Sequence, residues 1–190
     1  YTVTPGTLFV YLPNNIIKID CKKESIISGV ILAPDYLRKN FLQWNKISPL
    51  FIQTLLEQGY DVQTFPSATL QNPPFDRIIF GEVPHLRTET QGATPFDRDT
   101  RLTADFLQYL DQKPDKPFFA FLFYDLLHAI SIPAPHRHKF EPSWEYANYM
   151  ALSNEMDATP FFNLYRNCGW YVDSLVGSIV GELEHKGLLD

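Results

Sequence analysis

Cysteine, basic charge and long apolar runs are all scarce in this chain of 190 residues. The 2 cysteines are too few for a disulfide framework or a zinc knuckle, so both are expected to be free thiols. A formal net charge of -6 argues against a surface that grips nucleic acid, because phosphate binding needs a basic footprint. No apolar run approaches the roughly 18 residues that indicate a membrane-spanning helix.

What is present is a globular composition, with 45% hydrophobic and 15% aromatic residues to fill a core. Residues 14–20 are typical of a short strand, and residues 47–60 have the periodicity of a helix that stops at Gly59. Residues 60–67 then return as a strand. A strand, helix, strand succession predicts a parallel sheet with right-handed crossovers.

The most apolar stretch, residues 118–124, predicts a central strand that is buried on both faces of that sheet. Amphipathic helices are expected at 94–112 and, as the longest one, at 161–186. Residues 76–80 are read as a short strand or a turn. The fold class is therefore α/β, a three-layer α/β/α arrangement with a mainly parallel sheet, and residues 129–160 form a proline-punctuated insertion.

Asp125 and His128 follow the predicted central strand directly. Ligands of open parallel sheets bind at the carboxyl ends of the strands, where loops converge. His128 is therefore expected to face an anionic group, with Asp125 as an orienting partner. The alternative is that His128 only ties its own loop to Ser131 or to a backbone carbonyl.

The phrase "PFFAFLFYDLLHAISIP" resembles a segment of sulfatases and related members of the alkaline phosphatase superfamily. In that family such a histidine faces the sulfate or phosphate. Residues 48–80, 94–112 and 157–190 further resemble the periplasmic domain of the YejM (PbgA) type inner-membrane sulfatase-like proteins of Gram-negative bacteria. The resemblance covers about residues 46–190, whereas residues 1–45 match much less well.

The resemblance implies that residues 1–190 are part of a single sulfatase-like domain that is incomplete at both ends. Proteins of this type carry an N-terminal bundle of membrane helices, and their domain continues into a strand and an Asp-His-Gly type metal motif. Neither is found in this chain, which begins at Tyr1, so any leader or anchor is expected to lie outside it. The implied location is the periplasmic face of the bacterial inner membrane.

The family's chemistry implies a divalent metal ion, Ca, Mg, Mn or Zn, held by several carboxylates and histidines beside a nucleophile. Asp20 matches the family's first metal ligand, and His128 is expected to line a concavity shared with the strand end near Asp20. An acidic residue that ends a strand in a turn is an equal interpretation of Asp20. The family's nucleophile pattern places Ser25 or Ile26 where a threonine is expected, and isoleucine cannot be a nucleophile. Cys21 lacks the following Pro or Ala and Arg of a formylglycine precursor.

Two functions stay open on this basis. One is a metal-dependent hydrolase of sulfo- or phosphoesters, and the other is a non-catalytic domain that binds anionic lipid, cardiolipin or lipopolysaccharide, in outer-membrane homeostasis. A purely structural domain is a third reading. With one candidate metal carboxylate and no convincing nucleophile, the chain alone is expected to be inactive, and its metal site is expected to be incomplete.

Overall fold

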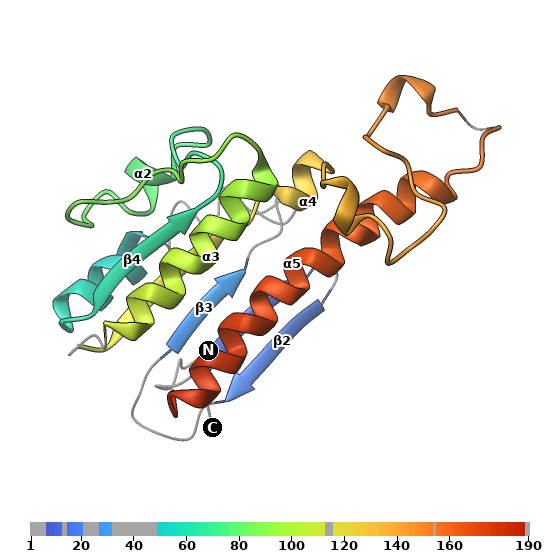
Figure 1. Ribbon diagram of the computed structural model, residues 1–190. Helices are drawn as coiled ribbons and strands as arrows, with labels where there is room; N and C mark the ends of the chain where they lie inside the picture. Colours follow the sequence, from blue (N-terminus) through green and yellow to red (C-terminus); the bar gives the residue numbers. More distant parts are fainter. Residues whose placement is uncertain are drawn as a thin grey trace.

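A 5-stranded sheet in the order β2-β1-β3-β5-β4 organises the computed structural model (Figure 1). The structure describes residues 7–12, 15–20, 27–31, 49–112, 116–153 and 155–188. The strands are β1 (Thr7–Leu12), β2 (Asn15–Asp20), β3 (Ile27–Ile31), β4 (Asp61–Pro66) and β5 (Phe118–Phe123). Strands β1, β3, β5 and β4 run parallel to one another, and β2 runs antiparallel to β1.

Helices cover both faces of this sheet, which confirms the expected three-layer α/β class. Helices α3 (Pro95–Asp111) and α5 (Thr159–His185) lie on one face. The helix over residues 49–57 and the short α2 (Phe75–Ile78) lie on the other. Two layers of apolar side chains therefore enclose β4 and β5, as parallel strands require.

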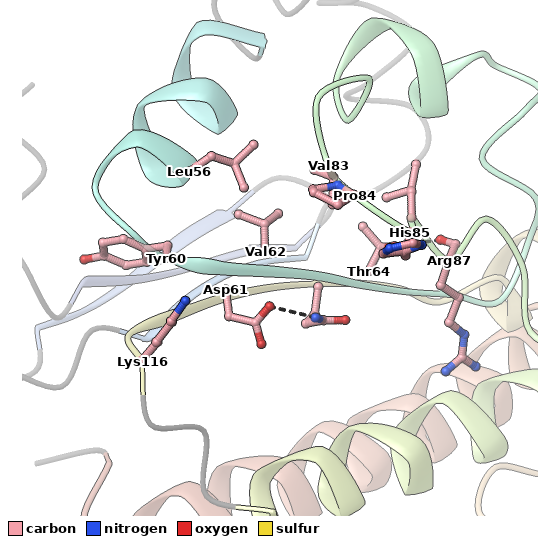
Figure 2. Close-up of a pocket in the computed structure, with 12 residues that line it drawn as sticks. Leu56, Tyr60, Asp61, Val62, Thr64, Val83, Pro84, His85, Arg87 and Lys116 are labelled. Carbon is pink, nitrogen blue, oxygen red and sulfur yellow. Dashed lines mark hydrogen bonds between the residues drawn. The ribbon is translucent and has the colours of Figure 1, made fainter.

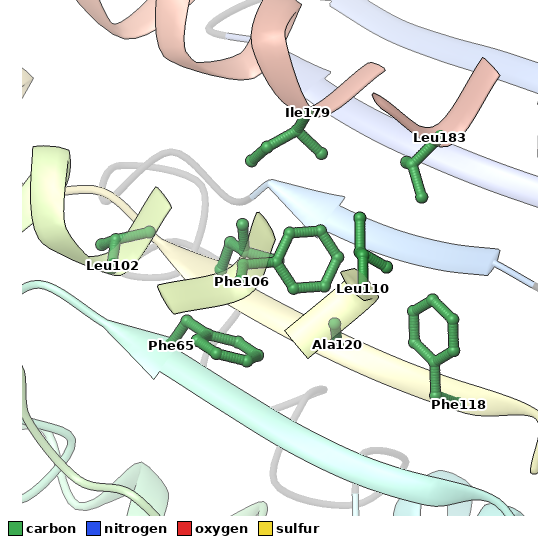
Figure 3. Close-up of a cluster of buried hydrophobic side chains, with 9 residues drawn as sticks. Phe65, Leu102, Phe106, Leu110, Phe118, Ala120, Ile179 and Leu183 are labelled. Atoms are coloured by element: carbon green, nitrogen blue, oxygen red, sulfur yellow. The ribbon is translucent and has the colours of Figure 1, made fainter. Parts of the chain in front are cut away.

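Strand β5 is the centre of the core, because it pairs with β3 on one side and with β4 on the other. Its alternate side chains reach opposite layers, as the period of a strand dictates. Phe118, Ala120 and Leu122 pack toward α3 and α5, as Figure 3 shows for Phe118 and Ala120. Phe119 and Phe121 pack in the opposite layer. The predicted central strand is confirmed.

Helix α3 begins at a capping box, in which Thr94 accepts a hydrogen bond from the Asp97 amide and the Asp97 side chain accepts one from the Thr94 amide. Its inward stripe includes Leu102, Phe106 and Leu110, as the periodicity predicted. Figure 3 shows these side chains meeting Ile179 and Leu183 of α5. The apolar spacing alone thus identified both helices and their buried faces.

Gly59 and Gly187 end the helix over residues 49–57 and α5, and their positive φ values of 83° and 66° are ones that L side chains rarely adopt. This confirms the predicted stop signals. Leu50, an apolar residue of the first helix, is nevertheless 65% exposed. Ile52 is buried in its place.

Two expectations for the shorter elements were wrong or incomplete. Residues 14–20 do contain a strand, but β2 pairs antiparallel with β1, whereas a parallel strand was expected. Residues 76–78 belong to the one-turn helix α2, and residues 79 and 80 form a turn and a bend, so the turn alternative holds in part and the strand alternative is wrong. Pro73 and Pro74 precede this helix, and proline is tolerated where a helix starts because its missing N–H is not needed there.

The segment after β5 contains α4 (Leu126–Ala129) and two 3-10 turns, η1 (Ala134–His136) and η2 (Tyr149–Ala151). Side chains of α5 hold part of it: Asn167 bonds the Arg137 and Phe140 carbonyls, and Asn163 donates to the Pro142 carbonyl. The residues near η2 extend away from the sheet (Figure 1). Across the described ranges, no helix is both long and apolar enough to cross a bilayer.

Candidate functional site

Polar side chains from four segments of the chain meet where β4 and β5 end. Ser67 follows β4 and Asp125 follows β5, so both lie at the carboxyl edge of the sheet. Arg98 and Asp99 come from the start of α3, and His128 lies in α4. Parallel strands bring their carboxyl ends to one edge, which explains why residues so far apart in the chain assemble here.

Arg98 ties the ends of the two strands together. Its Nε atom donates to the Ser67 carbonyl at 2.8 Å, and its Nη2 atom lies 3.2 Å from the Asp125 Oδ2 atom. The Arg98 and Asp125 side chains are 22% and 16% exposed, so water screens this ion pair less than a surface pair. Burial raises the pKa of Asp125, and the charges of His128 and Arg98 oppose that rise.

Asp99 lies beneath this pair and is fully buried. Its Oδ1 atom accepts the Asp125 amide at 3.1 Å, and its Oδ2 atom accepts the Leu126 amide at 2.9 Å. Burial raises the pKa of Asp99 to about 6, although these bonds act in the opposite direction. The Ser67 hydroxyl also lowers the Asp99 pKa, yet its buried oxygen makes no hydrogen bond of acceptable geometry to any described residue.

His128 is exposed on the one-turn helix α4, and its own amide donates to the Asp125 carbonyl at 3.0 Å. Leu126 anchors the same turn in the core, where it contacts the cluster formed with Leu164 and Cys168. Within the described residues, the His128 imidazole makes no hydrogen bond to Ser131 or to a carbonyl. The His128 side chain is thus exposed, and it lies near enough to Asp125 to act electrostatically on that carboxylate. Its role toward an anionic group stays a prediction.

Asp20 does not join these residues, and its expected position beside His128 is wrong. It pairs with Thr7, the first residue of β1, and so lies at the amino edge of the parallel strands. Strand β5 has 6 residues, which separates that edge from the carboxyl edge by roughly 16 Å. The cause is the antiparallel direction of β2, which the apolar pattern of the strand could not reveal. Ser25 lies outside the described residues.

No group of three or more histidine, cysteine, aspartate or glutamate side chains within the described ranges could hold a metal ion. At the strand ends, the Asp99 carboxylate is fully buried and accepts two amides, and one oxygen of Asp125, Oδ2, is paired with Arg98. The described donors thus do not fit a metal by themselves. The metal ion stays a prediction, and no chemical step is assigned to it below.

A cavity of about 630 Å³ lies elsewhere, around the outer edge of β4 (Figure 2). Leu56, Val62 and Val83 form its apolar wall, and Lys116 lies at its rim. Neither Asp125 nor His128 lines it. The expectation that His128 lines a concavity with Asp20 is therefore not met by this cavity.

The sequence interpretation overlooked Arg98, Asp99 and Ser67. Asp99 carried a usable signal, because it lies on the buried stripe of α3 at a spacing of three from Leu102 and seven from Phe106. A carboxylate on the apolar face of a helix is rarely unpaired. Arg98 and Ser67 had no comparable signal, since their contacts depend on the crossing of α3 over the strand ends.

Comparison with known proteins adds one positive finding. The sequence model of the family described as Sulfatase matches residues 40–190 of this chain. No curated protein matches the chain. The matched range contains β4, β5, α3, α4 and α5, and with them every side chain described at the strand ends.

Proposed function

Because the chain belongs to the sulfatase family, we propose that its strand-end site binds the sulfate or phosphate group of an ester. The chain then contributes to a metal-dependent sulfo- or phosphoester hydrolase. The YejM-type resemblance extends the proposal to a periplasmic domain at the bacterial inner membrane. Esters of this kind carry the anionic group that the site is proposed to recognise.

The proposal is supported most by one observation: His128 is exposed, whereas the turn that carries it is anchored in the core. Leu126 is fully buried and two amides of the turn are bonded to Asp99, so little freedom remains for the backbone to lose on binding. Asp125 is partly neutralised by Arg98 at 3.2 Å, which reduces its repulsion of an incoming anion. An imidazole N–H can then donate to a sulfate or phosphate oxygen.

The residues described here bind and orient but provide no nucleophile. His128 donates a hydrogen bond to the anionic group, and Asp125 orients and electrostatically supports the imidazole. Residues 1–190 alone are expected to show no metal-dependent turnover of an aryl sulfate or aryl phosphate; turnover that a chelator abolishes would contradict this expectation.

The direct test is isothermal titration of the 190-residue chain with sulfate and with inorganic phosphate. Loss of a hydrogen bond to a charged group costs about 1.5 to 3 kcal/mol, so His128→Ala should weaken binding by roughly tenfold or more. His185→Ala is the matched control, because His185 is also exposed but lies at the C-terminal end of α5, away from the strand-end site. Equal affinities for His128→Ala and the unaltered chain would overturn the proposal.

A second candidate function, non-catalytic binding of anionic lipid such as cardiolipin or lipopolysaccharide, is favoured by one observation. Large exposed apolar side chains gather near η2 and the first half of α5: Tyr146, Tyr149, Met150, Leu152, Phe162 and Trp170. Such a gathering is typical of interaction surfaces. Flotation with cardiolipin-containing vesicles distinguishes the candidates, since Met150→Asp should reduce lipid binding without changing sulfate affinity. Flotation unaffected by Met150→Asp would remove this candidate.

A further inference from the structure

We infer that Asp99 is a positioning residue of the strand-end site. Its two oxygens hold the amides of Asp125 and Leu126 and thereby fix the direction in which α4 presents His128. What His128 binds rests on the proposed function, whereas the support of the turn rests on geometry alone. The proposed ligand of His128 and the positioning role of Asp99 can therefore be refuted separately.

The bonding pattern requires a carboxylate at this position. Oδ1 receives the Asp125 amide and Oδ2 receives the Leu126 amide, so both side-chain atoms act as acceptors. An asparagine of the same shape has one acceptor and one donor group, so one of the two amides would face another N–H. A buried donor left without an acceptor is costly. Asparagine therefore cannot reproduce the support, although it fills the same space.

The other end of the turn is constrained as well. Ile130 follows α4 in the left-handed conformation, with φ 46° and ψ 52°, which β-branched residues rarely adopt. Its amide donates to the Leu126 carbonyl at 2.9 Å, and its side chain packs against the Leu126 cluster. A strained backbone conformation persists only where the surrounding contacts hold it in place. The turn that carries His128 is thus held at both of its ends.

The protonation state of Asp99 should control this support. Burial raises its pKa to about 6. A proton on either oxygen turns an acceptor into a donor, so one of the two amides loses its partner. The turn is therefore expected to loosen as the pH falls below about 6. The charged and titratable groups around Asp99 are Arg98 in α3, Tyr124 and Asp125 at the end of β5, and Cys168 in α5.

The first experiment needs no substitution. In a nuclear magnetic resonance titration of the 190-residue chain, the amide protons of Asp125 and Leu126 should shift with one common midpoint. That midpoint should match the midpoint of the Asp99 carboxyl carbon. Amide shifts that do not follow the Asp99 carboxyl would overturn the inference, even if the substituted chains failed to fold.

The second experiment compares Asp99→Asn with Asp111→Asn, an exposed carboxylate at the other end of the same helix. Asp99→Asn should increase hydrogen exchange of the Leu126 amide and weaken sulfate binding, each by about tenfold. Asp111→Asn should change neither. Unchanged exchange in Asp99→Asn would overturn the positioning role. Faster exchange in a chain that binds no sulfate, with or without the substitution, would confirm the support and refute only the proposed function.

Discussion

The core beneath α3 and α5 and the strand ends beneath α4 bury different kinds of group. In the core, the Phe106 ring packs against Phe65 and Phe118 inside an apolar cluster. Among the described residues, the one cation found over these rings is the Arg87 guanidinium, which lies 5.5 Å from the Phe65 centroid. At the strand ends, a fully buried carboxylate and a half-buried ion pair replace apolar packing. Apolar burial stabilises at about 25 cal/mol per Å², whereas a buried charge costs free energy even when it is bonded.

This difference indicates that the two regions serve different ends. Apolar packing in the core stabilises the folded domain. Holding buried polar groups in one arrangement at the strand ends costs part of that free energy. Departures from apolar packing of this kind concentrate at functional sites.

Phe106→Ala should be the most damaging of the changes considered. The ring is 2% exposed and lies 5.3 Å from the Phe65 ring and 6.4 Å from the Phe118 ring, centroid to centroid. Removing it leaves a cavity that should lower the free energy of unfolding by about 3 to 5 kcal/mol. Urea denaturation followed by circular dichroism measures this loss. A loss as small as that of Leu107→Ala, which truncates a partly buried neighbour, would contradict the assignment of the core.

Asp99→Asn should change the pH dependence of stability rather than simply lower stability. The folded pKa of Asp99 is raised from 3.8 to about 6, so the free energy of unfolding is largest below pH 3.8, where protonation removes the cost of burying the charge. It falls as the pH rises through 6, although the carboxylate form is the one that holds the two amides. The unaltered chain should therefore lose about 3 kcal/mol relative to Asp99→Asn between pH 3.8 and 7. Urea titrations of both chains across this range measure the difference. A difference that does not vary with pH would contradict the burial of a charged Asp99.

Arg98→Gln should lower the free energy of unfolding by about 2 kcal/mol, between the values for exposed and fully buried ion pairs. It should also raise the pKa of Asp125 further, because a neighbouring cation is lost. Lys186→Gln is the comparison, since it removes a cation paired at 2.8 Å with Asp111, whose side chain is 68% exposed. Chemical denaturation at neutral pH should rank Arg98→Gln as the more damaging; the reverse order would refute the distinction between the regions.

Thr94→Ala should have the smallest effect, about 1 kcal/mol, because it removes only the cap of α3. Thermal unfolding detects a change of this size. The start of α3 carries Arg98 and Asp99, so sulfate affinity should be measured on the same sample. An unfolding temperature identical to that of the unaltered chain would show that the capping box contributes nothing measurable.

Much of the fold was predictable because burial imposes a period on the sequence. Residues 118–124 form a short apolar run of the length typical of a strand covered on both faces, and α3 and α5 repeat apolar residues at the spacing of a helix. The direction of β2 was not predictable, because a short apolar strand does not specify its neighbour or its orientation. That one uncertainty placed Asp20 at the wrong edge of the sheet.

The candidate site was predictable only in part. His128 and Asp125 follow β5 in the chain, so their place at the strand ends followed from the strand itself. Arg98 contacts Ser67 and Asp125 across separations of 31 and 27 residues, and only the packing of α3 on the sheet brings them together. Contacts of that range leave no periodic pattern in a single sequence.

The most direct measurement of the central claim is a sulfate titration of the unaltered 190-residue chain, observed through the ring resonances of its 5 histidines. The account predicts a saturable shift of the His128 ring and no comparable shift of the His185 ring. Inorganic phosphate should compete for the same site. An unmoved His128 ring, or an equal and unsaturated drift of every histidine, would contradict the proposal that the strand ends beneath α4 bind an anionic group.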